Sequence, residues 1–261
     1  MNRFEGKIAI ITGASTGLGP VMARMMADEG AKVVLAARKG HLCEEVAHEI
    51  DAQHPGAAIG MTADVTDEED VARMVGAAMD KWGQVDVMMS NAAQPGQDKW
   101  IWEQTVDNML DTFKVDCMAA MLCSREVLNR SMLERKKGSI VTFSSGAAWG
   151  GMERKSHYSA AKAALIVLTK TIAKEVGPHG IRANCVVPGS IATELLGNYY
   201  KRVAGERGVD EQVLWQESAD RVPLKTISTP EDVAHMALFL ASDQARTVTG
   251  QAINVDAGYT I

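Results

Sequence analysis

The chain has 261 residues, of which 46% are hydrophobic, and its formal net charge is −6. This aliphatic content is sufficient for one sizeable core. The negative charge and the lack of a long Lys or Arg run argue against a nucleic-acid partner or a membrane surface, and no apolar run is long enough to span a bilayer. The four cysteines lack paired or metal-ligand spacing, and no signal peptide precedes the first apolar run, so we expect reduced thiols, no metal site and a cytoplasmic protein.

Short apolar runs alternate with amphipathic stretches along the chain. The first run, Lys7–Ile11, predicts a strand, and the pattern over Leu18–Glu29 predicts a helix. A second buried strand is expected at Lys32–Ala36, after Gly30 ends that helix. Further strands are expected at Ala58–Ala63, Val85–Ser90, Ser139–Ser144, Ile181–Val187 and Ala252–Val255. Helical patterns fill most of the gaps, at Leu42–Ala52, Glu68–Trp82, Val106–Glu134, Tyr158–Val176 and Asp232–Leu240.

This alternation predicts the fold class. Strands that are apolar throughout are buried on both faces, and helices between them imply an α/β protein with a parallel sheet covered on each side. Right-handed crossovers make this a doubly wound arrangement. We expect one domain over residues 1–261. Residues 190–224 contain polar helical pieces and no apolar strand, and a long insertion of this kind is typical of a lid over a binding site.

A glycine-rich segment, Thr12–Gly19, joins the first strand to the first helix. Glycines at this place allow a tight turn and let backbone N–H groups approach a pyrophosphate, and the helix N-terminus favours the negative charge. The spacing is G-x-x-x-G-x-G, and its position between a strand and a helix makes it more specific than the glycines alone. The sequence therefore predicts a dinucleotide-binding loop.

The end of the second strand indicates which dinucleotide binds. A carboxylate there would accept hydrogen bonds from a ribose 2′-hydroxyl, but this chain has Ala37 followed by Arg38 and Lys39. No negative charge repels a 2′-phosphate, and a guanidinium is well shaped to bind one. We therefore expect NADP(H) rather than NAD(H), although NAD(H) stays possible and Arg38 is alternatively an ordinary surface charge.

Several motifs together resemble those of the short-chain dehydrogenase/reductase family, over essentially the full length of the chain. They are Thr12–Gly19, Asp64-Val65, Asn91-Ala92-Ala93, Ser144-Ser145, Tyr158-Ser159-Ala160-Ala161-Lys162, Pro188-Gly189 and Val255-Asp256-Ala257-Gly258. The resemblance implies a Rossmann fold with a seven-stranded parallel sheet, assembled as a dimer or tetramer. It also implies an oxidoreductase that transfers a hydride between a nicotinamide and a carbonyl or secondary alcohol, such as a carbonyl reductase or an alcohol dehydrogenase.

The resemblance assigns cofactor contacts residue by residue. Asp64 is expected to accept from the adenine amino group beside Val65, or alternatively to cap a turn before the next helix. Asn91 is expected beside the cofactor ribose. The remaining cofactor contacts are expected in the first glycine loop and after the sixth strand, at Gly13, Ser15, Thr16, Gly17, Leu18, Gly19, Pro188, Gly189, Ile191 and Thr193.

The proton chemistry is expected at Tyr158 and Lys162, which are four residues apart and share one face of a helix. A free tyrosine titrates near ~10, and a neighbouring ammonium favours the phenolate. Tyr158 is thus the expected general acid/base, and Lys162 also holds the nicotinamide ribose. Ser145 is expected to face the substrate oxygen, with the adjacent Ser144 as the competitor, because a strand alternates its side chains.

Three positions depart from the family pattern. The family usually has a catalytic asparagine where this chain has Asp116, and we expect the carboxylate near Lys162 to reduce or pH-shift turnover. Ala93 and Ala257 stand where glycine is usual, and both are tolerated if the backbone there has negative φ.

The substrate is not identified by any residue. Gln94, Ala147–Met152 with Trp149, and the segment from Ser190 are the expected pocket walls, with Trp100 and Trp102 nearby. These aromatic residues favour a partly apolar small molecule or simply pack the lid. Two other functions stay open: a 3-oxoacyl-(acyl-carrier-protein) reductase, whose acidic partner would meet Lys201, Arg202 and Arg207, and a non-catalytic NADP(H)-binding regulator.

Overall fold

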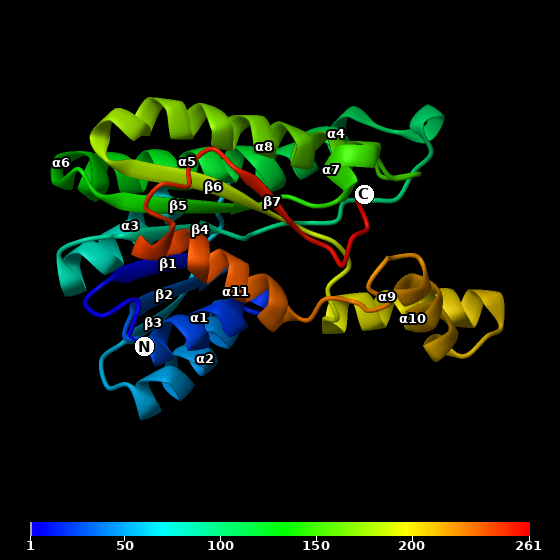
Figure 1. The fold of residues 1–261 in the computed structure, drawn as a ribbon, viewed down its shortest axis with the longest axis horizontal. Helices are drawn as coiled ribbons and strands as arrows, with labels where there is room; N and C mark the ends of the chain where they lie inside the picture. The colour runs from blue at the N-terminus through cyan, green and yellow to red at the C-terminus, as the bar shows by residue number, and fades with distance from the viewer. Residues whose placement is uncertain (1) are drawn as a thin grey trace.

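The computed structural model describes residues 2–261, whose core is a seven-stranded parallel sheet (Figure 1). The strand order is β3-β2-β1-β4-β5-β6-β7. The chain therefore begins in the middle of the sheet, adds β2 and β3 on one side, and then returns to add β4 to β7 on the other side of β1. That reversal opens a crevice at the carboxyl ends of the strands, where ligands bind in such sheets. The bounds are β1 (Ile8–Thr12), β2 (Lys32–Ala37), β3 (Ala58–Thr62), β4 (Val87–Ser90), β5 (Gly138–Phe143), β6 (Ile181–Pro188) and β7 (Ala252–Val255).

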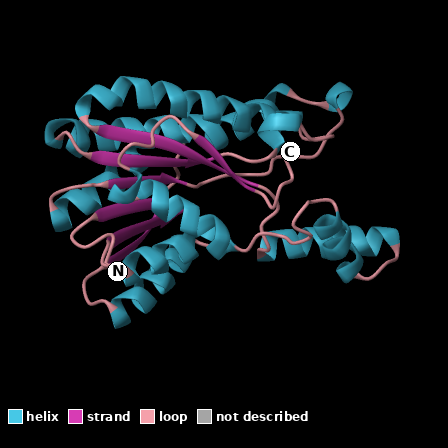
Figure 2. Ribbon diagram, in the orientation of Figure 1, coloured by secondary structure: helices cyan, strands magenta, loops and turns pink. Residues whose placement is uncertain are grey.

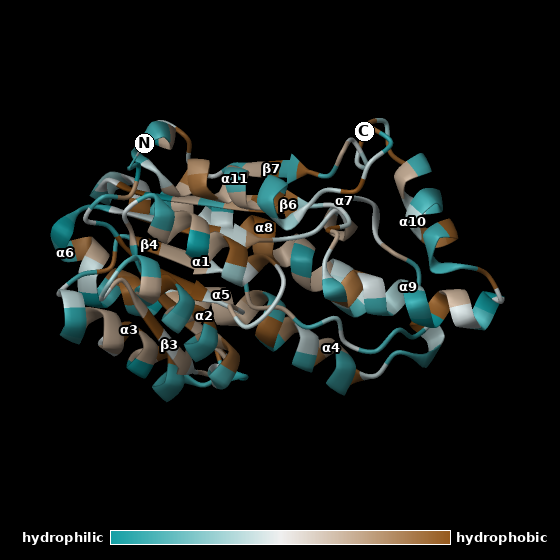
Figure 3. Cartoon of the chain, turned by 90° about the horizontal axis from the view of Figure 1, so that it is seen from below, coloured by the Kyte–Doolittle hydropathy of each residue, from teal (hydrophilic) through white to brown (hydrophobic). Residues whose placement is uncertain are grey.

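Helices cover both faces of the sheet, because each strand is buried on both sides. One face packs against α1 (Leu18–Asp28), α2 (Gly40–Gln53) and α11 (Pro230–Ala241). The other packs against α3 (Glu68–Trp82), α5 (Ala119–Val127) and α8 (Ser156–Val176). The strands are mainly hydrophobic in Figure 3, where the outer helices carry the polar colours. The predicted doubly wound α/β fold is confirmed.

The helix predicted over Val106–Glu134 is present, but two π-helical turns interrupt its α-helical pitch. The structure divides it into α4 (Val106–Phe113), α5 and the short α6 (Leu133–Arg135), with π-helical turns at Lys114–Met118 and Leu128–Met132. In the first π turn the N–H of Ala119 bonds to the carbonyl of Lys114, five residues back. Such turns insert one extra residue and are frequent at functional sites. The short helix α7 (Ala147–Gly150) was not predicted from the sequence.

Residues 190–224 form a helical hairpin rather than part of the sheet. Its helices α9 (Glu194–Arg207) and α10 (Glu211–Asp220) enclose a small cluster of their own, in which Trp215 meets the ring of Tyr200 edge-on at 4.9 Å between centroids. Its two connecting segments meet in a bridge between Ile191 and Ser228. The hairpin projects beyond the carboxyl ends of the strands in Figure 2. Within residues 2–261, no helix is long and apolar enough to cross a membrane.

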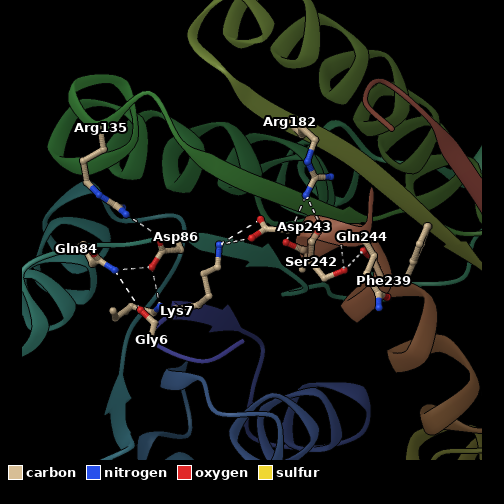
Figure 4. A network of polar contacts seen from close by, with 12 residues as sticks. Gly6, Lys7, Gln84, Asp86, Arg135, Arg182, Phe239, Ser242, Asp243 and Gln244 are labelled. Carbon is tan, nitrogen blue, oxygen red and sulfur yellow. Dashed lines mark hydrogen bonds and ion pairs between the residues drawn. The ribbon is translucent and has the colours of Figure 1, made fainter. Parts of the chain in front are cut away.

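Polar contacts join the elements at the opposite, amino end of the sheet (Figure 4). Lys7 Nζ lies 2.9 Å from Asp243 Oδ2, and Arg135 donates to Asp86 at 2.6 Å. The guanidinium of Arg182 donates to the carbonyls of Leu240, in the last turn of α11, and of Ser242, just after it. These contacts fasten the helix ends at the side of the sheet opposite the glycine loop.

The two alanines that replace glycines differ in conformation. Ala257 has φ of 53°, in the left-handed region, whereas Ala93 is not among the positive-φ residues. The condition for tolerating the extra methyl is therefore not met at Ala257. An L-residue costs ~1–2 kcal/mol in this region, which glycine avoids.

We expect Ala257→Gly to stabilise the protein by about 0.5–1 kcal/mol, raising Tm by about 2 °C in a thermal melt. Ala93→Gly is the matched control and should destabilise it, because glycine there only adds unfolded-state entropy. A lower Tm for Ala257→Gly would contradict this account.

Candidate active site

The glycine loop between β1 and α1 is built for a close approach. A Cβ on Gly13 would lie 2.8 Å from Ala92 Cα, and one on Gly19 would lie 2.5 Å from the carbonyl oxygen of Gly13. Gly17, with φ of 66°, is the N-cap of α1 and supplies no side-chain hydrogen bond to its first N–H groups. In this loop Ser15 is half-buried and Thr16 is exposed, whereas Leu18 is buried. The helix N-terminus therefore offers free N–H donors to an anion, which fits the pyrophosphate of a dinucleotide.

The ends of the neighbouring strands β2 and β3 carry the residues that we expect to contact the adenosine half of the dinucleotide. Ala37 is buried at the end of β2, and Arg38 and Lys39 follow as exposed side chains. Asp64 Oδ1 accepts from the N–H and hydroxyl of Thr66 at 2.9 and 2.7 Å. Asp64 thus forms the turn that sequence analysis gave as its alternative role, beside the buried Val65.

Asn91 ties the end of β4 to the glycine loop. Its side-chain Nδ2 donates to the carbonyls of Thr12 and Gly13 at 3.1 and 3.2 Å. The hydroxyl of Thr12 in turn accepts from the N–H groups of Asn91 and Ala92. Asn91 therefore lies at the expected crevice, and it also holds the loop in place, which the sequence pattern did not reveal.

The expected catalytic side chains converge at the start of α8. Lys162 is buried, its Nζ lies 5.6 Å from the centroid of the Tyr158 ring, and it donates to the carbonyl of Phe143 at 3.0 Å. Ser144 is also buried and donates to the Lys162 carbonyl at 2.8 Å. Ser145 is half-buried, and its hydroxyl accepts from the N–H of Ala147 at 3.3 Å. Ser144 is thus used within the fold, and Ser145 is the more exposed of the two serines.

Asp116 lies behind this pair, in the first π turn. Its Oδ1 accepts from the N–H of Gln94 at 2.7 Å, and its Oδ2 lies 3.8 Å from Lys162 Nζ without a hydrogen-bond partner. Burial raises the pKa of the Asp116 carboxyl, against the opposing effects of the Lys162 ammonium and the Gln94 N–H. The expected carboxylate beside Lys162 is present.

We expect Asp116→Asn to lower the midpoint of the alkaline pH–rate profile for alcohol oxidation by about one pH unit. The ionised carboxylate opposes the field of the Lys162 ammonium at Tyr158, and the amide removes that opposition. At pH values below the midpoint, Asp116→Asn should therefore turn over the alcohol faster than the wild type. An unchanged profile would show that Asp116 has no electrostatic role.

The same variant has a signature in stability. Because the folded pKa of Asp116 is raised, folding takes up a proton there; the resulting stabilisation is present below the unfolded pKa and is lost as pH rises through the folded pKa. Urea unfolding of both proteins across this window should show the advantage of Asp116 over asparagine falling with rising pH.

The segment after β6 brings together the other predicted contacts. A Cβ on Gly189 would lie 2.9 Å from Asp256 Cβ, so glycine is required where Pro188-Gly189 passes the last loop. Thr193 is the N-cap of α9. Ile191 forms the bridge at the base of the hairpin. These residues therefore connect the crevice to the hairpin.

Aromatic residues flank the same end of the molecule. Trp149 is half exposed, and its indole N–H donates to Asn254 Oδ1 at 2.9 Å. Trp100 and Trp102 stack with centroids 5.2 Å apart on the exposed segment after β4. His157 was not among the residues predicted from the sequence; it is buried beside Tyr158 and bonds to the carbonyl of Pro95 at 2.9 Å. Only its place on the helix, one residue before the tyrosine, could have drawn attention to it.

Comparison with known proteins gives a consistent result. A family model described as enoyl-(acyl carrier protein) reductase matches residues 13–260. A short-chain dehydrogenase/reductase of Aspergillus oryzae is 34% identical, covering 99% of this chain and 96% of the relative. A 3-oxoacyl-(acyl-carrier-protein) reductase of Synechocystis is 33% identical, covering 99% and 98%. The crystal structure of an actinorhodin polyketide ketoreductase variant with NADPH superposes with a TM-score of 0.91 at 29% identity, covering 100% and 98%. The chain belongs to the short-chain dehydrogenase/reductase family of oxidoreductases.

Proposed function

We propose that this enzyme is an NADP(H)-dependent reductase of a small carbonyl compound, with Tyr158 as its general acid/base. The observation that carries the proposal is the buried Lys162 ammonium, held by the Phe143 carbonyl and lying 5.6 Å from the Tyr158 ring centroid. A fixed positive charge there stabilises the phenolate and eases proton transfer at neutral pH. A regulator that only binds the cofactor has no need of this arrangement.

NADP(H) fits the residues present. The free N–H groups at the start of α1 would bind the pyrophosphate, and Arg38 with Lys39 would bind a 2′-phosphate. Asp64 and Val65 would meet the adenine, and Asn91 and Lys162 the ribose; Ile191 and Thr193 would meet the carboxamide and phosphates. When bound, the nicotinamide supplies or accepts the hydride.

The chain itself supplies the proton and the orientation of the substrate. In reduction, the hydroxyl of Tyr158 donates its proton to the carbonyl oxygen as the alcohol forms, and in oxidation the phenolate accepts it. Ser145 donates a hydrogen bond to the same oxygen, since Ser144 is already bonded to the Lys162 carbonyl. We further propose that residues 1–261 act as one domain, that the hairpin of residues 190–224 is the substrate lid, and that the enzyme is a dimer or tetramer.

A direct assay tests the proposal. Absorbance of the reduced nicotinamide is followed with NADPH and NADH, against a panel of small ketones and a 3-oxoacyl thioester. We expect NADPH-dependent turnover of at least one ketone. Tight cofactor binding without turnover of any substrate would favour the regulator instead.

The second candidate is a 3-oxoacyl-(acyl-carrier-protein) reductase, which the similarity to the Synechocystis enzyme favours. Its acidic carrier protein needs a basic surface, yet Arg202 pairs with Glu206 at 2.7 Å and Arg207 with Glu217 at 2.8 Å. Because these pairs neutralise two of the three expected lid cations, we place the small carbonyl first. Turnover of the thioester alone would reverse this order.

A further inference from the structure

The segment that follows β4 runs along α4 to the segment before α8, and we call its residues Gln94–Gln104 the strap. Its first residue is fixed by Asp116, and the side-chain Nε2 of Gln94 donates to the Asp111 carbonyl at 2.8 Å. Its far part is tied to the segment before α8, because the N–H of Lys99 donates to the Arg154 carbonyl at 2.9 Å. The strap therefore spans from the end of β4 to the start of the helix that carries Tyr158.

His157 lies under the middle of this strap. Its Nε2 is 2.9 Å from the carbonyl oxygen of Pro95, and its Nδ1 is 3.0 Å from Nε2 of Gln104. A carbonyl only accepts and an amide NH₂ only donates, so these partners assign the neutral ring with its proton on Nε2. The orientation of Gln104 is fixed in turn, because its Oε1 accepts from Asn108 Nδ2 at 2.7 Å. One buried imidazole thus joins two points of the strap that are nine residues apart in sequence.

The strap is shaped to lie on this ring. Gly96 has φ of 64°, and a Cβ there would lie 2.5 Å from His157 Nε2 and 2.6 Å from Thr112 Oγ1. Only glycine allows both the left-handed backbone and this close approach. Gly96 and His157 are therefore complementary surfaces, one on the strap and one on α8.

We propose that His157 is a positioning residue that fastens the strap across the substrate side of the crevice and so sets the affinity for the carbonyl substrate. The strap follows Asn91 and shares Asp116 with Lys162, so it borders the reacting groups directly. Other contacts also hold the strap: Asp98 lies 3.2 Å from Lys155 Nζ, and Asn108 bonds to the N–H and carbonyl of Gln97. His157 is a buried anchor beneath it, and a strap released from that anchor holds the substrate poorly. The substrate half of this inference rests on the proposed reductase activity.

The test compares His157→Ala with the wild type in kinetics and in amide hydrogen exchange of the strap. We expect the KM for the ketone to rise about tenfold with kcat changed less than about threefold, and the KM for NADPH to stay within about twofold. The amide protons of the strap are expected to exchange faster with solvent, while those of α8 keep their wild-type protection. His179 is an exposed histidine just after the same helix, and His179→Ala is the matched control. It should leave kcat, both KM values and the exchange of the strap unchanged.

Two further variants separate positioning from simple support of the fold. His157→Gln keeps an N–H donor for the Pro95 carbonyl and should recover most of the ketone KM. Gly96→Ala leaves α8 intact, disturbs the strap from its own side, and should reproduce the His157→Ala effect. A fall in Tm with both KM values unchanged, or a parallel rise in the KM for ketone and NADPH, would overturn the proposal. The hydrogen-exchange comparison needs no substrate. It therefore tests whether His157 holds the strap in place even if the wild type reduces no ketone.

Discussion

Tyr158→Phe lowers kcat/KM for ketone reduction by about 10³-fold while the protein still binds NADPH. The variant removes the hydroxyl that gives the proton, and general acid catalysis typically contributes 10²–10⁴-fold. It keeps the ring that lies beside the Lys162 ammonium, so the lysine and the crevice stay in place. Steady-state kinetics and cofactor fluorescence measure the two quantities separately.

The control for this variant is Tyr259→Phe, which removes a hydroxyl from a half-exposed tyrosine near the C-terminus. It should retain wild-type kinetics. If Tyr158→Phe keeps more than a tenth of wild-type kcat/KM, another group supplies the proton and the proposed role of Tyr158 is wrong. Loss of NADPH binding in the same variant would instead indicate that Tyr158 mainly holds the cofactor.

The parts of this fold that follow from local pattern were predictable. Strands such as Ile181–Pro188 are apolar throughout because they are buried on both faces, and that pattern is visible without any partner. The glycine loop and the Tyr158–Lys162 spacing are also local, so the sequence places both. Their convergence at one edge follows from parallel strands, whose carboxyl ends share an edge of the sheet.

The parts that were missed depend on contacts between distant residues. The π turn at Asp116 forms where its carboxylate meets Gln94 and Lys162, which lie 22 residues before it and in another helix. His157 contacts Pro95 across 62 positions of sequence, and no periodicity encodes that contact. The left-handed backbone of Ala257 is likewise imposed by the loop around it, against the local preference of alanine.

Ala37→Asp is expected to shift the preference between cofactors by about 100-fold in favour of NADH, measured as the ratio of the kcat/KM values for NADPH and NADH. Ala37 ends β2 at the place where the adenosine ribose is proposed to bind. A carboxylate there accepts hydrogen bonds from the 2′- and 3′-hydroxyls of NADH and repels the 2′-phosphate of NADPH. Arg38 stays in both proteins, so the comparison isolates the added charge.

Ala37→Asn is the matched control, because it has nearly the same size and polarity as aspartate but no charge. It should move the ratio far less than aspartate does, since repulsion of the phosphate is the larger part of the effect. An equal shift for both variants would mean that the side chain acts by bulk at the buried end of β2 and not by charge. A ratio unchanged in Ala37→Asp would show that Arg38 and Lys39 do not bind a 2′-phosphate, and the NADP(H) assignment would then fall while the roles of Tyr158 and Lys162 would stand.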